Sequence, residues 1–280
     1  MAGGVLYVVA TPIGNLEDVT LRALRVLREV DLIAAEDTRR TRILLQRHGI
    51  DRPLTSYHDA VERDRAPALV EKLRQGQRIA LVSDAGTPGI ADPGYHLVRG
   101  AVAAGIPVVP IPGPSAVAAV VSVAGIPVER FVFEGFLPSR TAARRSRLRE
   151  LAAETRAVVF LEAPGRLAAC LADLESTLGD RDIVIGRELT KLHEELVRGR
   201  ISTVRKHVSA MGRVRGECVI VVGGRSAEEM PADDDVETRI VALHREGLGT
   251  REIAARLARD TGRTRRELYR RILEVVAAVE

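Results

Sequence analysis

The sequence predicts an α/β protein of two domains followed by a small helical unit, and three observations support this class. Short apolar runs rich in β-branched residues alternate with amphipathic helical patterns. Loops rich in glycine and proline follow several of these runs. The length of 280 residues, 46% of them hydrophobic, is enough for about two domains with cores of ordinary size.

The first domain is predicted to contain a parallel or mixed sheet. Strands are expected at residues 5–10, 32–35 and 79–83, followed by helices near residues 18–30, at 38–48 and at 92–104. In a sheet built this way, ligands bind beyond the carboxyl ends of the strands. The glycine and proline loops of this chain follow those ends, which makes them candidate binding loops.

The stretch from residue 100 to residue 128 has no charged residue over 29 positions, which is long enough for a membrane span. It also contains five prolines, which would leave backbone groups unpaired in lipid. We therefore expect a buried strand, a loop and a helix of a soluble protein there, and no membrane association.

The second domain is expected to begin after the prolines at 112–114. Its predicted elements are a helix at 115–124, a strand at 131–133, a helix at 142–154, a strand and loop in "VVFLEAPGRL", further structure in "DIVIGRELTKLHEELVRG", and an apolar strand in "ECVIVVGG". The predicted division is 1–113, 114–226 and 227–280.

The last segment is predicted to be a linker and a basic helical tail. "RSAEEMPADDD" is acidic and contains proline, as linkers often do. Residues 251–271 hold eight arginines and three acids, and Ile253, Ala254 and Leu257 share one helical face. With a turn at 261–262, this spacing suggests a helix-turn-helix. Nucleic-acid contact and simple domain packing both remain open.

Composition and motifs exclude several classes of protein. The two cysteines form no CxxC pair, so we expect neither a disulfide framework nor a metal site, and a reducing cytoplasm fits best. The N-terminus lacks the features of a signal peptide. No Walker A loop, dinucleotide-binding GxGxxG or GxSxG elbow occurs. The net charge of +4 mildly favours an anionic partner.

Three loops carry the chemistry: "ATPIGN" (10–15), "SDAGTPGIADPG" (83–94) and "PIPGPSA" (110–116). Together they could line one cleft with backbone groups, small side chains and the carboxylate of Asp84, which suits a cofactor that contains adenosine. Each loop taken alone is more often simply a turn, and Asp84 is equally well explained as a cap for the amides of its own loop.

These loops, with "AAEDTR" (34–39), "FEGFLP" (133–138), "LEAPGRL" (161–167) and "RELTKLHEE" (187–195), resemble the tetrapyrrole methylase superfamily, and within it the branch that methylates ribosomal RNA of the small subunit. The resemblance implies a two-domain α/β fold with an S-adenosylmethionine cleft between the domains and a homodimer. It also implies 2′-O-methylation of a cytidine in 16S rRNA. Many tetrapyrrole-modifying relatives have a glycine-rich first loop, whereas this chain has "ATPIGN", which disfavours a porphyrin-type substrate.

Site residues are assigned on the matching motifs. The cofactor-binding candidates are Pro12, Gly14, Asp84, Gly86, Thr87, Pro88, Pro112, Gly113, Pro114, Ser115, Ala116 and Glu162. The candidates for activating the ribose hydroxyl are Glu36, Asp37 and Lys191, with Glu162 as an outside possibility. The RNA-binding candidates are Arg39, Arg40, Arg42, Arg144, Arg145, Arg263 and Arg266.

Alternatives to these roles stay open. Lys191 is also explained by a surface ion pair with Glu194 or Glu195, and each arginine run by a solvated helix face. A methyltransferase for a tetrapyrrole precursor would share the fold and cofactor but would not need the basic tail. A non-enzymatic nucleic-acid-binding regulator would leave the cleft-forming α/β sequence unexplained.

Overall fold

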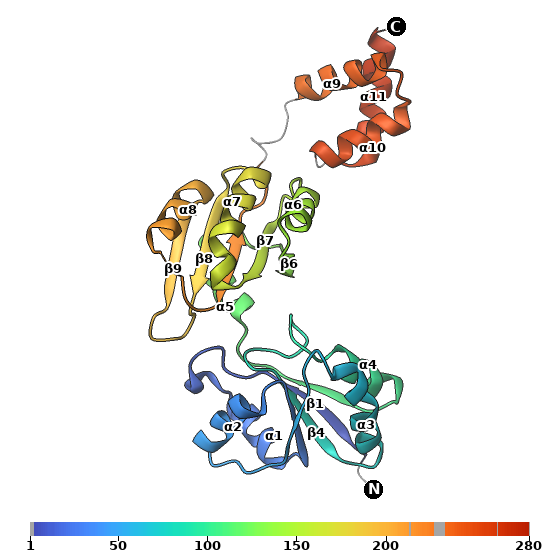
Figure 1. Cartoon of the computed structure of the whole chain (residues 1–280). Helices are drawn as coiled ribbons and strands as arrows, with labels where there is room; N and C mark the ends of the chain where they lie inside the picture. The colour runs from blue at the N-terminus through green and yellow to red at the C-terminus, as the bar shows by residue number, and fades with distance from the viewer. Residues whose placement is uncertain (1–2, 213, 227–232, 262, 280) are drawn as a thin grey trace. The chain divides into compact units, whose positions relative to one another are not determined.

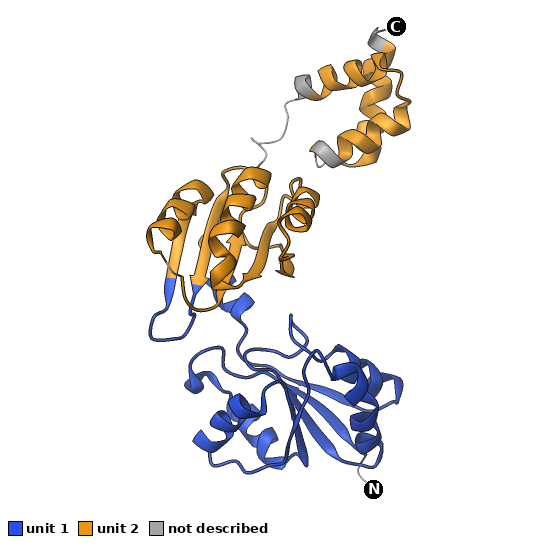
Figure 2. Ribbon diagram, viewed as in Figure 1, with its two compact units in different colours: residues 1–123, 187–195 blue, residues 124–186, 196–280 orange. Residues whose placement is uncertain are grey.

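The computed structural model describes residues 3–212, 214–226, 233–261 and 263–279 (Figure 1). Figure 2 divides the chain into two compact units. Unit 1 comprises residues 1–123 and 187–195, and unit 2 comprises residues 124–186 and 196–280. Unit 1 therefore extends past the boundary predicted at residue 113 and includes a segment that the sequence analysis placed in the second domain.

Unit 1 contains a five-stranded sheet in the order β3-β2-β4-β1-β5. Its strands β1 and β4 are labelled in Figure 1. Its strands are β1 (Val5–Val9), β2 (Leu32–Ala35), β3 (Leu54–Ser56), β4 (Arg78–Val82) and β5 (Val108–Ile111). Every adjacent pair is parallel. Because parallel strands end at the same edge, the loops after β1, β2, β4 and β5 all begin at one edge of this sheet.

Helices cover both faces of this sheet. They are α1 (Leu21–Glu29), α2 (Thr38–Arg47), α3 (Glu62–Arg74) and α4 (Tyr95–Ala103), with the short η1 (Leu16–Asp18) before α1 and α5 (Ala116–Ser122) after β5. Alternate strand residues point to opposite faces. Val9 and Ile33 pack with α1 and Leu45 of α2 on one face, whereas Leu6 and Ile79 pack with α3 and α4 on the other.

Unit 2 contains a mixed sheet in the order β6-β7-β10-β8-β9. Its strands are β6 (Phe131–Phe136), β7 (Ala157–Glu162), β8 (Asp182–Arg187), β9 (Glu195–Arg200) and β10 (Cys218–Val222). β7 pairs with β6 in parallel and with β10 antiparallel. The helices α6 (Thr141–Glu150), α7 (Leu167–Leu178) and α8 (Ile201–Ala210) contribute buried side chains to one core with the strands, and η2 (Pro164–Arg166) precedes α7.

The tail forms three helices, α9 (Asp233–Arg245), α10 (Thr250–Thr261) and α11 (Arg265–Val279). Ile253, Ala254 and Leu257 are buried in their common core, as their shared face predicts. Thr264 and Glu267 hydrogen-bond reciprocally through side chains and backbone amides, which is a capping box at the start of α11. The predicted linker is shorter than expected because α9 already begins at Asp233, and Gly262 of the predicted turn lies outside the described residues.

Four elements were not predicted from the sequence. β3 has only three residues, α3 contains Pro67 within a helical pattern, α7 directly follows a loop, and α8 directly follows β9. The fourth helix begins at Tyr95 and not at the predicted residue 92, because Pro93 and Gly94 precede it and Gly94 has a φ of 156°. Among the described residues, no helix combines the length and apolar character needed to cross a membrane.

Candidate active site

The structure joins the three predicted binding loops at the carboxyl edge of the parallel sheet. Thr11 and Gly86 exchange two backbone hydrogen bonds of 2.8 and 2.9 Å, which connect the loops after β1 and β4. The Thr11 hydroxyl also donates to the Ser83 carbonyl at 3.1 Å. The Thr87 hydroxyl donates to the Pro114 carbonyl at 3.3 Å, which adds the loop after β5. The three loops therefore form one continuous surface within unit 1.

Glycine allows these loops to approach each other closely. Gly86 has a φ of 82°, a conformation that other residues seldom adopt, and a Cβ there would lie 3.5 Å from the Ile13 side chain. A Cβ at Gly113 would come within 3.0 Å of the Ala10 Cβ. The glycines that suggested a ligand also serve loop-to-loop packing, so their presence alone does not assign a ligand.

Two carboxylates brace the loops after β2 and β4. The Asp84 amide donates to Glu36 Oε2 at 3.0 Å, and the Asp37 amide donates to Asp84 Oδ1 at 2.9 Å. Arg40, from the first turn of α2, lies 3.3 Å from Asp84 Oδ2. Asp84 thus accepts a hydrogen bond from the loop after β2, so its role is not limited to capping the amides of its own loop.

The carboxyl edge holds more negative charge than its neighbours neutralise. Burial, with the nearby charges of Asp84 and Asp59, raises the pKa of Glu36 despite the Asp84 amide and Arg40. Burial and the charge of Glu36 raise the pKa of Asp92 to about 7. Asp92 was not a predicted site residue. Its signal in the sequence was its place in the same loop as Asp84, but only the fold brings the two acids to Glu36.

Asp37 has the opposite character. Hydrogen bonds from the Arg39 side chain and amide hold the pKa of Asp37 well below its usual range. Asp37 is also the N-cap of α2, with its side chain accepting from the Arg39 amide at 2.8 Å. These contacts make Asp37 a helix cap that stays ionised, and they argue against its predicted role as a proton acceptor.

The remaining cofactor candidates in unit 1 lie on the same loops. Pro12 is buried next to Thr11, and Pro88 follows Thr87. Ser115 caps α5 by accepting from the Ala118 amide at 3.5 Å, with Pro112 before it and Ala116 opening the helix. The structure therefore brings Pro12, Asp84, Gly86–Pro88 and residues 112–116 onto one edge of one sheet, as the motifs predict.

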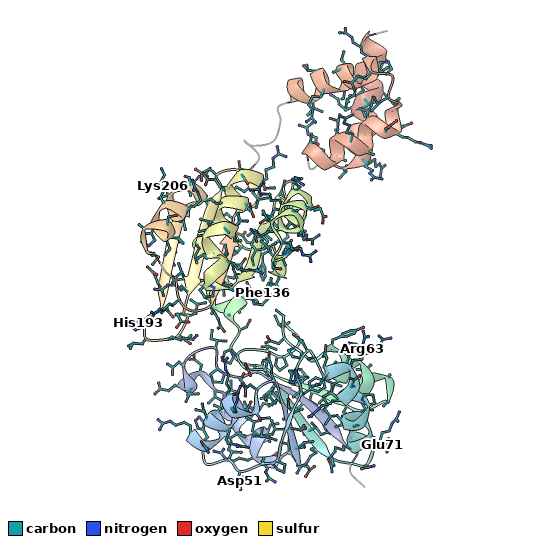
Figure 3. The ribbon with its side chains drawn as sticks, viewed as in Figure 1. Asp51, Arg63, Glu71, Phe136, His193 and Lys206 are labelled. Atoms are coloured by element: carbon teal, nitrogen blue, oxygen red, sulfur yellow. The ribbon has the colours of Figure 1, made fainter. Side chains whose placement is uncertain are left out.

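Lys191 lies in the loop at 188–194 between β8 and β9, which belongs to unit 1 and carries His193 (Figure 3). Its ammonium is 2.8 Å from Glu188 Oε1. Lys191 thus pairs with Glu188, and of the two acids that the sequence offered, Glu194 accepts from the Thr190 amide and Glu195 pairs with Arg187. A Cβ at Gly14 would lie 2.5 Å from Lys191 Cγ, so this loop packs directly on Gly14.

Glu162 and Arg144 have buried side chains in unit 2. The Glu162 side chain is fully buried and accepts from the Ala163 amide and from Arg166 at 2.6 Å. The Arg144 side chain is 4% exposed and pairs with Asp173, which also binds Arg145 at 2.6 Å. Burial removes Arg144 from the RNA-binding set, because a phosphate cannot reach its guanidinium, and it assigns Glu162 to holding its own loop.

The other arginine candidates are accessible. Arg42 and Arg266 are exposed, Arg263 is half-buried and Arg145 is half exposed. Arg39 and Arg40 are exposed but pair with Asp37 and Asp84. Among the described residues, no group of three or more His, Cys, Asp or Glu side chains is arranged to hold a metal ion.

Comparison with known proteins identifies the family. The model of "Tetrapyrrole (Corrin/Porphyrin) Methylases" matches residues 5–205. The chain belongs to the tetrapyrrole methylase family. It is 45% identical over 273 residues, 97% of each chain, to "Ribosomal RNA small subunit methyltransferase I" of Pasteurella multocida, and 46% identical, over 98% of each chain, to the protein of that name from Pseudomonas aeruginosa. The resemblance that the motifs predict is confirmed.

A shorter relative and solved structures of other proteins delimit the shared fold. A Thermotoga maritima protein with the same printed name is 47% identical over 99% of its own length, which corresponds to 79% of this chain. The methyltransferase CobJ superposes with a TM-score of 0.60 at 22% identity, covering 80% of this chain and 95% of that one. Diphthine synthase gives 0.59 at 16% identity, covering 80% and 91%. The predicted two-domain α/β fold is therefore confirmed.

Proposed function

We propose that this protein transfers the methyl group of S-adenosylmethionine to the ribose 2′-hydroxyl of a cytidine in 16S rRNA within the small ribosomal subunit. The observation that carries the proposal is its 45–46% identity, over nearly the whole chain, to proteins named for small-subunit rRNA methylation. The homodimer and the cytoplasmic location implied by the family resemblance belong to the same proposal.

The carboxyl edge of the parallel sheet fits the cofactor. S-adenosylmethionine supplies an electrophilic methyl group on a positively charged sulfur and also carries an ammonium. Burial, and after it the negative charge of neighbouring carboxylates, raises the pKa values of Glu36 and Asp92, and a bound cation would relieve the repulsion between these charges. Asp84, which is partly exposed and hydrogen-bonded to the Asp37 amide, is the side chain that we assign to the positive charge.

Glu36 is the proton acceptor that we favour among the three predicted ones. It is half-buried with a raised pKa, whereas Asp37 is held ionised by Arg39, and a stronger base accepts a proton more readily. Holding the ribose hydroxyl in line with the methyl group and the sulfur would lower the activation barrier as much as the base does, because the reacting groups are already oriented.

The tail is assigned to binding the ribosomal subunit and not to the chemistry. The match to the Thermotoga relative leaves about a fifth of this chain unmatched, a share similar to that of the tail, so a protein of the same printed name lacks a segment of that size. Arg266 on α11 is exposed and Arg263 precedes the helix, and we assign both to phosphate contacts. Deleting residues 231–280 should weaken binding to small subunits while leaving the cofactor affinity within twofold; unchanged subunit affinity at several salt concentrations would contradict this assignment.

The deciding experiment is transfer of labelled methyl from S-adenosylmethionine to intact small subunits, naked 16S rRNA and a tetrapyrrole precursor in parallel. We expect label in subunit RNA that maps to a 2′-O-methylcytidine. Label only in the tetrapyrrole would support the second candidate, methylation of a tetrapyrrole precursor. That candidate is favoured only by the likeness to structures such as uroporphyrin III C-methyltransferase, with a TM-score of 0.56 at 19% identity over 79% of this chain and 97% of that one.

A further inference from the structure

A pocket lies in unit 1 beside the acidic edge, which is the carboxyl edge of the sheet with Glu36, Asp84 and Asp92. It has a volume of about 740 Å³, which is in the range of small-molecule sites. Its walls include Asn15 and Leu16 after the first loop, Arg47 and His48 at the end of α2, and Lys191 and Leu192 of the loop at 188–194. All of these residues belong to unit 1, so the pocket does not depend on how the two units are placed.

The loop at 188–194 is held in one unusual conformation. Glu188 and Thr190 have φ values of 50° and 66°, which cost energy in residues other than glycine. The loop is fixed by the Lys191–Glu188 ion pair, by the Thr190 amide donating to Glu194 at 2.6 Å and by close packing on Gly14. Such strain persists only where the surrounding contacts impose it. The contacts leave Leu192, in the same loop, 93% exposed.

The pocket presents groups that the described residues leave without partners. The His48 Nε2 and Thr190 Oγ1 atoms are buried and have no hydrogen-bond partner. Arg47, at the end of α2, forms no ion pair among the described side chains. Leu16 is 37% exposed and lines the pocket together with Leu192. Apolar side chains, a cation and unused hydrogen-bonding atoms together suit a ligand with a flat ring and an anionic group.

The pocket differs in charge from the acidic edge. Glu36, Asp84 and Asp92 favour a cation there, whereas the walls of this pocket carry two cations, Arg47 and Lys191, and one acid, Glu17. Lys191 pairs with Glu188, and Arg47 forms no ion pair among the described side chains. The loop after β1 reaches both the acidic edge and the pocket. Thr11 hydrogen-bonds to Gly86 in the loop of Asp84, and Gly14 packs against Lys191 on the pocket wall. Three residues of extended chain span at most about 11 Å, so the two places are neighbours.

We propose that this pocket binds one ribonucleotide of the RNA substrate, unstacked from its neighbours, with its base against Leu16 and Leu192 and its phosphate on Arg47. The inference rests on the proposed function, which makes RNA the substrate. Bases of single-stranded RNA commonly pack on flat or apolar side chains while basic residues follow the phosphates. An unstacked ribonucleotide would contact both the exposed Leu192, through its base, and Arg47, through its phosphate.

The test measures binding of a labelled single-stranded RNA of about ten nucleotides to the full-length protein. Arg47→Ala and Leu192→Ser should each raise Kd about tenfold. Arg47→Ala should also reduce the magnitude of the salt slope of log K by about 0.7, the contribution of one phosphate contact, whereas Leu192→Ser should leave the slope unchanged. Arg63→Ala is the matched control, since Arg63 is exposed on α3 of the same unit (Figure 3).

Calorimetric measurement of cofactor binding distinguishes a lost nucleotide contact from a general collapse of the loop at 188–194. Unchanged S-adenosylmethionine affinity in both variants is expected, whereas parallel loss of RNA and cofactor binding would overturn the pocket. RNA affinities within twofold of the parent would also overturn it, as would losses confined to intact subunits, which would indicate a protein partner. If the parent binds RNA through Arg47 but methylates no RNA, the proposed function fails and the nucleotide pocket stands.

Discussion

Unit 1 gathers carboxylates at the carboxyl edge of its sheet, where Glu36 and Asp84 accept hydrogen bonds from backbone amides, whereas unit 2 buries carboxylates against arginines. Asp173 binds both Arg144 and Arg145, and although its burial opposes ionisation, the hydrogen bonds from these arginines lower its pKa. At the edge of unit 1, burial and like charges instead raise the pKa values of Glu36 and Asp92. Removing one partner of a buried ion pair destabilises the fold, because it leaves the other charge uncompensated. Carboxylates whose pKa values are raised by burial and like charges instead mark a candidate ligand site.

The largest effect is expected from breaking the charge cluster of unit 2. Asp173→Ala should leave the buried Arg144 without its anion and lower the free energy of unfolding by about 3 kcal/mol. Hydrogen exchange of the β7 and β10 amides would measure this loss locally. Arg149→Ala, on the exposed side of α6, is the control and should change stability by less than about 0.5 kcal/mol. A loss below about 1 kcal/mol for Asp173→Ala would mean that the cluster is not structural.

The next largest loss of stability is expected from disturbing the contact between the loop at 188–194 and the loop after β1. Gly14→Ala places a Cβ 2.7 Å from the Leu189 carbonyl oxygen, so the loop must move, at a cost of about 1–3 kcal/mol. A lower melting temperature and faster hydrogen exchange at 188–194 would record it. Gly3→Ala has open space around its Cβ and should leave both unchanged. Equal behaviour of the two variants would show that the loop is not anchored on Gly14.

Much of the candidate site follows from the sequence because parallel strands bring distant loops to one edge. Strand and loop patterns were enough to place Asp84, Gly86 and Pro114 together. They could not distinguish Arg144 from Arg145, since burial on α6 depends on how the helix packs on α7. Nor could they find Asp92, whose pKa is raised first by burial and then by the charge of Glu36, 56 residues away along the chain. Local patterns predict elements, whereas burial and charge coupling are properties of the assembled fold.

A smaller effect is expected from neutralising the acidic edge without removing its hydrogen bond. Asp84→Asn keeps an oxygen to accept from the Asp37 amide but loses the negative charge. It should weaken S-adenosylmethionine binding about tenfold, or about 1.4 kcal/mol, with nearly unchanged apo melting temperature. Asp31→Asn is the control, because Asp31 accepts from the Arg78 amide at the opposite edge of the same sheet. Loss of stability equal to the loss of affinity would instead make Asp84 a structural brace.

The smallest effect is the pH dependence of stability that Asp92 imposes. The pKa of Asp92 rises from 3.8 to about 7 on folding, so the folded state holds the proton more tightly than the unfolded state. Its contribution to stability is full below about pH 4 and is lost as the pH rises through 7. Asp92→Asn keeps a neutral group at this position, so it should melt a few degrees above the parent at pH 8 and close to it at pH 4 in thermal scans. A variant that melts below the parent at pH 8 would show that the ionised carboxylate stabilises the loop, and that the acidic edge is already neutralised without a ligand.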